Sequence, residues 1–180
     1  MMKVKNIAAV LLAVVFIFVF SGCTGTNPSS TSNPTTAELK FENVDFSAVN
    51  INADDLVSHM NGKLTFDDKL YAMDGDIAET LYKVTGLCEK ISVVCSTGST
   101  AECIVFIVSS NENDAQAAAG KLRTYCSDMS RVYESYNVVE AEKLSKAFIM
   151  QNGKYTVMCV SPDSSAAESV YKEYVVSLVK

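Results

Sequence analysis

Apolar positions divide the chain into an N-terminal block and a longer patterned region. The fourteen residues 7–20 carry no polar side chain; Lys3 and Lys5 precede them and Ser21-Gly22-Cys23 follows. Basic residues, a short apolar run and small residues at its end are the layout of an export signal. As a helix the run reaches roughly 21 Å, short of the roughly 30 Å hydrocarbon core of a bilayer. We therefore expect a signal peptide at residues 1–22, with ordinary secretion and an uncleaved membrane helix as alternatives.

Phe20-Ser21-Gly22-Cys23 resembles the lipobox of bacterial lipoprotein precursors, although Phe20 departs from the usual aliphatic residue. The resemblance implies cleavage between Gly22 and Cys23, a diacylglyceryl thioether on Cys23 and usually acylation of the new amino group. Two acyl chains give stable anchoring, whereas one gives only marginal membrane binding. We therefore expect a protein anchored in the cell membrane through Cys23 and facing the extracytoplasmic side.

The next segment differs sharply in composition from the rest of the chain. Residues 24–37 consist of Thr, Ser, Asn, Pro and Gly with a single Ala and no large apolar residue. Such a segment cannot bury enough apolar surface to fold. We expect a flexible tether over residues 23–38 and a single domain over residues 39–180.

Within that domain, apolar periodicity and turn residues predict an alternation of helices and hairpins. The expected elements are a lead-in over 39–51, a helix from the Asn52 cap to Gly62, a helix over 75–83 capped by Asp74, strands 91–96 and 101–109, a helix opened by Ser110 or Asn111 that runs to about Tyr136, a short connection over 137–146 with one or two helical turns, strands 147–151 and 154–161 around Asn152-Gly153, and a helix opened by Ser161-Pro162-Asp163.

Residues 103–108 are apolar at every position, which predicts a central strand covered on both faces. We expect an α+β fold: a central antiparallel sheet of about four strands, formed by two hairpins. The two longer helices are expected on one face, and the short N-terminal helices with the lead-in on the other. Ile77, Leu81 and Val84 are expected to face inward from the second helix. The helix after Asn111 is expected to bury a seam made of Ala115, Ala119, Leu122, Cys126, Met129, Tyr133 and Tyr136.

The charge balance excludes one class of partner. The formal net charge is −6, and it becomes −8 once Lys3 and Lys5 leave with the signal. The chain contains only two arginines, Arg123 and Arg131. Nucleic-acid binding requires clustered basic residues that displace counterions, so we expect no nucleic-acid partner.

The cysteine count argues against a complete disulfide framework. Five cysteines follow Cys23, at positions 88, 95, 103, 126 and 159, and an odd number leaves at least one thiol free. Cys103 and Cys159 lie in apolar runs, where cysteine behaves as a small buried hydrophobe. Cys95 and Cys103 flank a predicted turn, so they could pair across the hairpin if the register places them opposite each other.

The domain also resembles a group of bacterial lipoproteins, chiefly from Firmicutes, that carry domain-of-unknown-function family 4358. The resemblance covers about residues 56–174 and implies no activity, cofactor or catalytic residue. Its matching residues are Leu81-Tyr82, Ala101-Glu102-Cys103-Ile104, the segment from Leu122 to Tyr136 with Arg123, and Gly153-Lys154-Tyr155.

Several residues invite a chemical interpretation, and each also has a simpler structural one. His59 is the only histidine and cannot form a metal site alone. The acids Asp67, Asp68, Asp74 and Asp76 suggest calcium but lack the EF-hand spacing. Ser169 and Lys172 have the S-x-x-K spacing of penicillin-recognising enzymes, without the accompanying motifs. We interpret these residues as caps, solvated loops and ordinary helix surface.

Glu102 and the tyrosines are the remaining candidates for a binding site. Glu102 lies at the start of an apolar strand and could pair with Arg123 or Arg131 or belong to a ligand site. We favour a structural pair or an exposed residue at the end of the strand over the ligand site. A tyrosine surface could bind sugars or peptides, although most of these positions also fit helix-core spacing. The tyrosines concerned are Tyr125, Tyr133, Tyr136, Tyr155, Tyr171 and Tyr174.

Cys23 is therefore the only residue with an assigned chemical role, that of lipid attachment. We expect a non-enzymatic envelope lipoprotein whose domain binds another component of the cell envelope, with an unknown envelope protein as partner, or acts as an accessory subunit, without catalytic residues, cofactor or metal. The alternative is a lipoprotein that binds a small ligand or peptide in a tyrosine-lined cleft. An enzyme is the third possibility.

Overall fold

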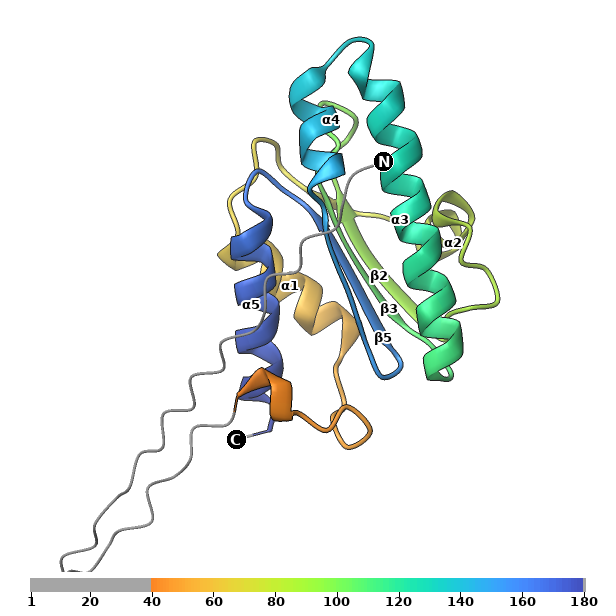
Figure 1. The fold of residues 1–180 in the computed structure, drawn as a ribbon, viewed down its shortest axis with the longest axis vertical. Helices are drawn as coiled ribbons and strands as arrows, with labels where there is room; N and C mark the ends of the chain where they lie inside the picture. The colour runs from red at the N-terminus through yellow and green to blue at the C-terminus, as the bar shows by residue number, and fades with distance from the viewer. Residues whose placement is uncertain (1–39, 180) are drawn as a thin grey trace, which may run out of the picture. The chain divides into compact units, whose positions relative to one another are not determined.

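The computed structural model describes residues 40–179, which form a five-stranded antiparallel sheet with helices on both faces (Figure 1). In chain order the elements are the 3₁₀ helix η1 (Phe41–Asn43), α1 (Ala53–Lys63), β1 (Tyr71–Ala72), α2 (Gly75–Tyr82), β2 (Lys90–Cys95), β3 (Cys103–Val108), α3 (Glu112–Glu134), α4 (Val138–Ser145), β4 (Phe148–Asn152), β5 (Tyr155–Val160) and α5 (Ser164–Ser177). The strand order is β1-β2-β3-β5-β4.

The central strand is β3, as its uninterrupted apolar run predicts. It pairs with β2 on one side and β5 on the other, and its residues 103–107 are all buried. Ile104 and Phe106 face one core cluster, whereas Val105 and Ile107 face a second cluster on the opposite side of the sheet. Because both faces of the strand are covered, neither parity of its side chains needs to be polar.

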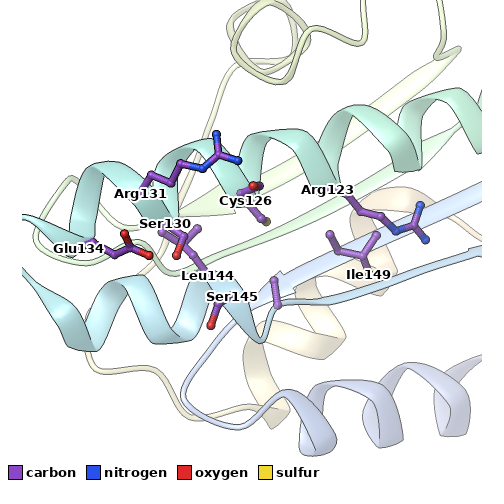
Figure 2. A pocket seen from close by; sticks show the side chains of 10 residues that line it. Arg123, Cys126, Ser130, Arg131, Glu134, Leu144, Ser145 and Ile149 are labelled. Atoms are coloured by element: carbon purple, nitrogen blue, oxygen red, sulfur yellow. The ribbon is translucent and has the colours of Figure 1, made fainter.

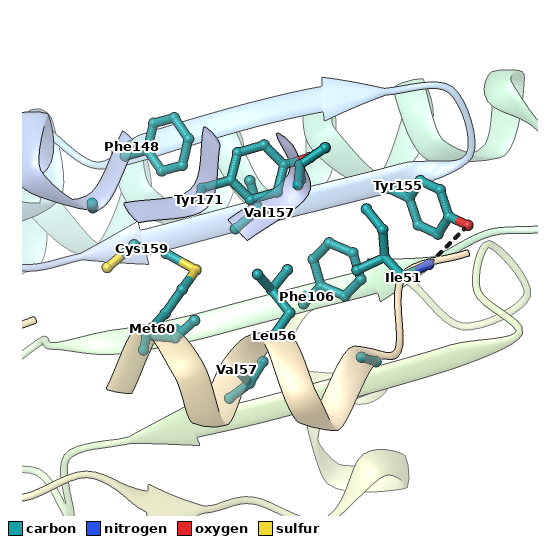
Figure 3. Packing of buried hydrophobic residues seen from close by; sticks show 14 of the residues in the cluster. Ile51, Leu56, Val57, Met60, Phe106, Phe148, Tyr155, Val157, Cys159 and Tyr171 are labelled. Carbon is teal, nitrogen blue, oxygen red and sulfur yellow. Dashed lines mark hydrogen bonds between the residues drawn. The ribbon is translucent and has the colours of Figure 1, made fainter. Parts of the chain in front are cut away.

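The first core cluster lies between the sheet and α1, α5 and the lead-in (Figure 3). Leu56 and Met60 on α1 are fully buried beneath the sheet. The Tyr155 ring stacks on Phe106 at 5.9 Å, and its hydroxyl donates to the Val49 carbonyl at 2.8 Å. The lead-in is thereby fastened to β5, and the expectation that it packs on the domain is confirmed.

The second core cluster lies between the opposite face of the sheet and α2, α3 and α4. Leu122 of α3 is fully buried there, as is Leu144 of α4 at 2 % exposure. The rings of Tyr82 and Tyr125 meet edge to face at 4.7 Å and join α2 to α3. Most of the predicted α3 seam is buried or half-buried, but Tyr136 lies past the end of the helix and is exposed.

The α+β class and the antiparallel sheet are confirmed, but the expected placement of the two longer helices is wrong. Figure 1 shows α3 and α5 on opposite faces of the sheet. The 11 residues of α1 span roughly 16 Å, too little to cover a face of five strands alone. The stripe of α5, formed by Ala167, Tyr171 and Val175, completes the cover of that face.

Three local expectations are also corrected. The inward stripe of α2 is Ala78 and Tyr82 followed by Val84, while Ile77 and Leu81 are exposed, because the large Tyr82 ring occupies the contact with α3. The last helix starts at Ser164 rather than next to Ser161, because Asp163 caps it by accepting from the Ala166 amide. The short edge strand β1 was not predicted and makes the fifth strand.

None of the helices within residues 40–179 is long and apolar enough to cross a membrane. The expected signal peptide, the lipid-attachment residue Cys23 and the whole of the expected tether over residues 23–38 lie outside the described residues.

Candidate functional site

The most concentrated charges in the described domain surround Lys143, where α4, the start of β3 and the loop at residues 67–68 meet. The Lys143 Nζ donates to Glu140 Oε1 at 2.8 Å, Glu102 Oε1 at 3.0 Å and Asp67 Oδ2 at 2.7 Å. The side chains of Lys143, Glu102 and Glu140 are at most 6 % exposed, whereas Asp67 is 61 % exposed. The lysine thereby uses all three of its donors.

The carboxylate oxygens of this network are occupied from other directions as well. The backbone amides of Asp67 and Asp68 donate to the two oxygens of Glu102 at 3.1 and 3.0 Å. The Ala101 amide donates to Glu140 at 2.7 Å. Since buried charges are tolerated only when they are paired and hydrogen-bonded, these bonds explain how two carboxylates remain in the interior.

The network holds a cation that belongs to the chain itself. Burial alone would lower the pKa of Lys143, but its hydrogen bonds to Asp67, Glu140 and Glu102 outweigh that effect and raise the pKa well above its ordinary value. The side chain therefore stays protonated at neutral pH and cannot act as a nucleophile or base. The geometry indicates that this network holds α4, the start of β3 and the loop at residues 67–68 together, rather than forming a ligand site.

A second feature is an open groove of about 510 Å³ between α3 and the segment from α4 to β4 (Figure 2). Both arginines of the chain lie along it on α3, together with polar and apolar side chains from α4 and β4. The lining residues are Arg123, Cys126, Ser127, Ser130, Arg131, Glu134, Leu144, Ser145, Ala147 and Ile149.

Three of the polar side chains that line this groove, Ser130, Arg131 and Ser145, are hydrogen-bonded or paired within their own chain. The Ser130 hydroxyl donates to the Ala141 carbonyl at 3.0 Å, and Arg131 contacts Asp128 at 3.4 Å. Burial raises the pKa of the Cys126 thiol to about 12, which leaves almost no thiolate at neutral pH. The groove therefore offers no activated nucleophile among the residues that line it.

A third feature is an apolar patch at the turn between α3 and α4, here named the tip patch: Val132, Tyr136, Val138 and Val139. These side chains are 52, 66, 69 and 62 % exposed and lie within eight consecutive residues. The Tyr136 ring packs against the Tyr133 ring, with 5.0 Å between the ring centroids, and this contact restricts the rotamers of Tyr136. Exposed apolar side chains that gather in one short segment of a folded domain are a candidate surface for binding a partner.

The predicted partners of Glu102 are wrong, and so is the alternative of an exposed strand-end residue, because Glu102 is buried. Arg123 and Arg131 lie on the groove side of α3, and Glu102 pairs with Lys143 instead. Sequence reasoning missed Lys143 and Glu140. Their spacing of three residues on a helix was the only local signal, since Glu102 is 41 residues away from Lys143.

The six candidate tyrosines do not converge on one cleft. Tyr155 and Tyr171 are buried in the first core cluster, and Tyr174 packs beside it. Tyr125 and Tyr133 line a hollow of about 180 Å³ on the opposite side of the sheet, and Tyr136 belongs to the tip patch. This separation weighs against the tyrosine-lined cleft.

The other candidates have local partners. His59 contacts the Tyr174 ring at 4.9 Å. Ser169 donates to the Ser165 carbonyl, and Lys172 pairs with Glu168 at 2.7 Å, so the S-x-x-K residues do not act on each other.

The four acids suggested for calcium are dispersed. Asp74 caps α2 and Asp76 lies in its first turn. Asp67 binds Lys143, while the hydroxyl of Ser96 donates to Asp68 and lowers its pKa. Across residues 40–179, no group of three or more histidine, cysteine or acidic side chains is arranged to hold a metal ion.

Comparison with known proteins supplies no relative from which a role could be transferred. No protein-family model, curated protein or solved structure matches this chain.

Proposed function

We propose that this protein is a membrane-anchored envelope lipoprotein whose domain binds another envelope protein through the tip patch. The anchoring part rests on the apolar run and on Ser21-Gly22-Cys23, with diacylglyceryl attached to Cys23. The resemblance to domain-of-unknown-function family 4358 stays a hypothesis, and the proposal does not depend on it.

The tip patch is the observation that supports binding to another envelope protein. It exposes four large apolar side chains at the end of a helical hairpin, whereas the charges around Lys143 are buried and already paired. Burial of apolar surface favours association, and tyrosine, here Tyr136, is one of the residue types enriched among the residues that dominate binding energy at protein interfaces. A partner with its own apolar surface therefore fits this site best.

The position of the tip patch is consistent with such a role. Figure 1 shows η1, where the described chain begins, at one end of the domain and the α3–α4 turn at the other. A tether over residues 23–38 would enter the domain beside η1, with a span of roughly 20 Å. The tip patch would then be presented away from the point of attachment.

Site-specific photocrosslinking in intact cells tests the binding part. A photoreactive residue at Val138 or Tyr136 is expected to give a discrete adduct with an envelope protein. The control is a photoreactive residue at Ile77, which is 61 % exposed on α2 and lies outside the tip patch. The proposal would be contradicted if neither tip position gave an adduct, or if Ile77 gave the same adduct as the tip positions.

Replacement of the attachment cysteine tests the anchoring part. Cys23→Ala is expected to abolish labelling by a fatty-acid analogue, because the thioether sulfur is lost. Labelling is measured by gel after growth with the analogue, and Cys88→Ala serves as a control that leaves it unchanged. A Cys23→Ala protein that still takes up the label would contradict lipid attachment at Cys23.

A further inference from the structure

Cys95 at the end of β2 and Cys103 at the start of β3 are directly opposite each other in the sheet. The register pairs their Cα atoms, which is the condition that the sequence left open. Both residues carry free thiols in this structure. The loop between them contains Glu102, so the pair lies next to the charged network.

The hydrogen-bond pattern identifies the kind of pair that the two cysteines form. The Ser96 amide donates to the Glu102 carbonyl at 3.0 Å, so residues 96 and 102 form a hydrogen-bonded pair. Pairs alternate along an antiparallel ladder, which makes Cys95 and Cys103 a non-hydrogen-bonded pair. Such pairs have Cα atoms about 4.5 Å apart and the closest side chains, within the range of about 4.4–6.8 Å that a disulfide spans.

The two side chains also share one side of the sheet. Cys103 belongs to the second core cluster and Cys95 packs against that cluster. Both line the hollow of about 180 Å³ beside Tyr82 and Tyr125. Cys95 is half-buried whereas Cys103 is 3 % exposed, so a reagent in the hollow meets Cys95 first.

The other thiols of the described domain are less well placed. Cys159 lies in the first core cluster, on the opposite face of the sheet. The Cys88 sulfur donates to the Val84 carbonyl at 3.6 Å. Cys126 faces the second cluster, where its sulfur contacts that of Met158 at 3.4 Å. Only Cys95 and Cys103 are neighbours on paired strands among the described residues.

We propose that Cys95 and Cys103 form a disulfide across the β2–β3 hairpin when a small-molecule disulfide, such as oxidised glutathione, reaches the hollow. The Cys95 thiolate attacks one sulfur of the oxidant, which forms a mixed disulfide and releases one thiol. The Cys103 thiolate then attacks the Cys95 sulfur and releases the second thiol. The two cysteines lose two electrons and two protons, and the oxidant gains them as two thiols.

The rate of this reaction depends on pH. Burial raises the pKa of both the Cys95 and the Cys103 thiol, so little thiolate exists at neutral pH. Below the thiol pKa the rate is expected to rise by about tenfold per pH unit, since the thiolate is the attacking species.

Disulfide mapping tests the proposal. The full chain carrying Cys23→Ser is purified in detergent, incubated with oxidised glutathione, alkylated under denaturing conditions and digested with a glutamate-specific protease, which cuts between Cys95 and Cys103 after Glu102. This substitution keeps the test independent of lipid attachment. We expect one linked peptide pair that joins Cys95 to Cys103, a mass lower by two hydrogen atoms, and alkylated thiols at Cys88, Cys126 and Cys159.

Two further variants sharpen the result. Cys95→Ala is expected to leave Cys103 fully alkylated, whereas Cys88→Ala leaves the linked pair intact. Complete alkylation of Cys95 in the oxidised chain, or its linkage to Cys126, would overturn the proposal. Because the mapping is made in the chain that retains Cys95, the result does not depend on how that variant folds.

Discussion

Replacing Lys143 with methionine is expected to lower the free energy of unfolding by about 3–5 kcal/mol. Methionine keeps the length of the aliphatic stem but removes the ammonium group that donates to Asp67, Glu102 and Glu140. Glu102 and Glu140 would then be buried together without a counter-charge, and the cost of an unpaired buried charge exceeds the gain from the original pair. Urea unfolding at neutral pH measures the loss.

Lys146→Met on the same helix is the matched control. Lys146 and its partner Glu142 are 65 and 61 % exposed, so solvent screens their attraction. Exposed pairs of this kind contribute only about 0.3–0.5 kcal/mol. A Lys143→Met loss no larger than that of Lys146→Met would show that the buried network does not stabilise the fold.

The pH dependence of the same comparison follows from the sign of the pKa shift. The folded-state pKa of Lys143 is raised above its ordinary value of 10.5. Stabilisation by this lysine is therefore complete below pH about 10.5 and is lost as the pH rises through the folded-state value. The difference between the parent chain and Lys143→Met is expected to stay constant from pH 7 to about 10 and to narrow at higher pH.

Local chemistry made most element boundaries predictable. The sequence predicts Asn52 and Asp74 as helix caps, and each accepts from two amides in the first turn of its helix. For the long helix it offers Ser110 or Asn111, and Asn111 is the cap, accepting from the Asp114 amide. Asn152-Gly153 marked the second hairpin, where Gly153 has a φ of +52°. Caps and tight turns depend on residues a few positions apart, and such short spacings are visible in the sequence.

The layer arrangement was harder to predict because it depends on which apolar stripes meet in space. The stripes of α3 and α5 look alike in the sequence, and nothing local assigns each to a face of the sheet. The α2 stripe was predicted one residue out of phase, since Ile77 and Leu81 have the same helical spacing as Ala78 and Tyr82. The contact of Tyr82 with Tyr125, 43 positions away in the chain, decides between the two phases.

The charged network around Lys143 was still harder to predict, because its contacts join residues that are far apart in the sequence. Its bonds to Glu102 come from amides 34 and 35 residues away and from a lysine 41 residues away. The sequence marks Glu102 as unusual because this acid directly precedes an apolar strand. It does not identify the partner, because several basic residues of the chain could pair with a carboxylate. Arg123 and Arg131 were the expected partners, while the position of α4 at the end of the sheet brings Lys143 to Glu102 instead.

Phe106→Ala is expected to cost about 3–5 kcal/mol, a large share of the roughly 5–15 kcal/mol that stabilises a typical domain. Phe106 lies in the middle of the central strand, is fully buried and stacks on Tyr155. Its removal leaves a cavity that the sheet, held by β2 and β5, cannot close. Thermal and urea unfolding measure the loss, and Val132→Ala on the exposed tip patch is expected to change stability by less than about 0.5 kcal/mol.

Milder variants of the same residue test the two-layer architecture, because the sheet separates the two core clusters. Phe106→Leu and Leu122→Val change opposite faces and share no cluster. Their effects on the free energy of unfolding should therefore add within about 0.5 kcal/mol. Phe106→Leu combined with Tyr155→Leu changes two rings in contact and should deviate from additivity by at least about 0.5 kcal/mol. Equal coupling in both double-mutant cycles would contradict a sheet that keeps the two clusters apart.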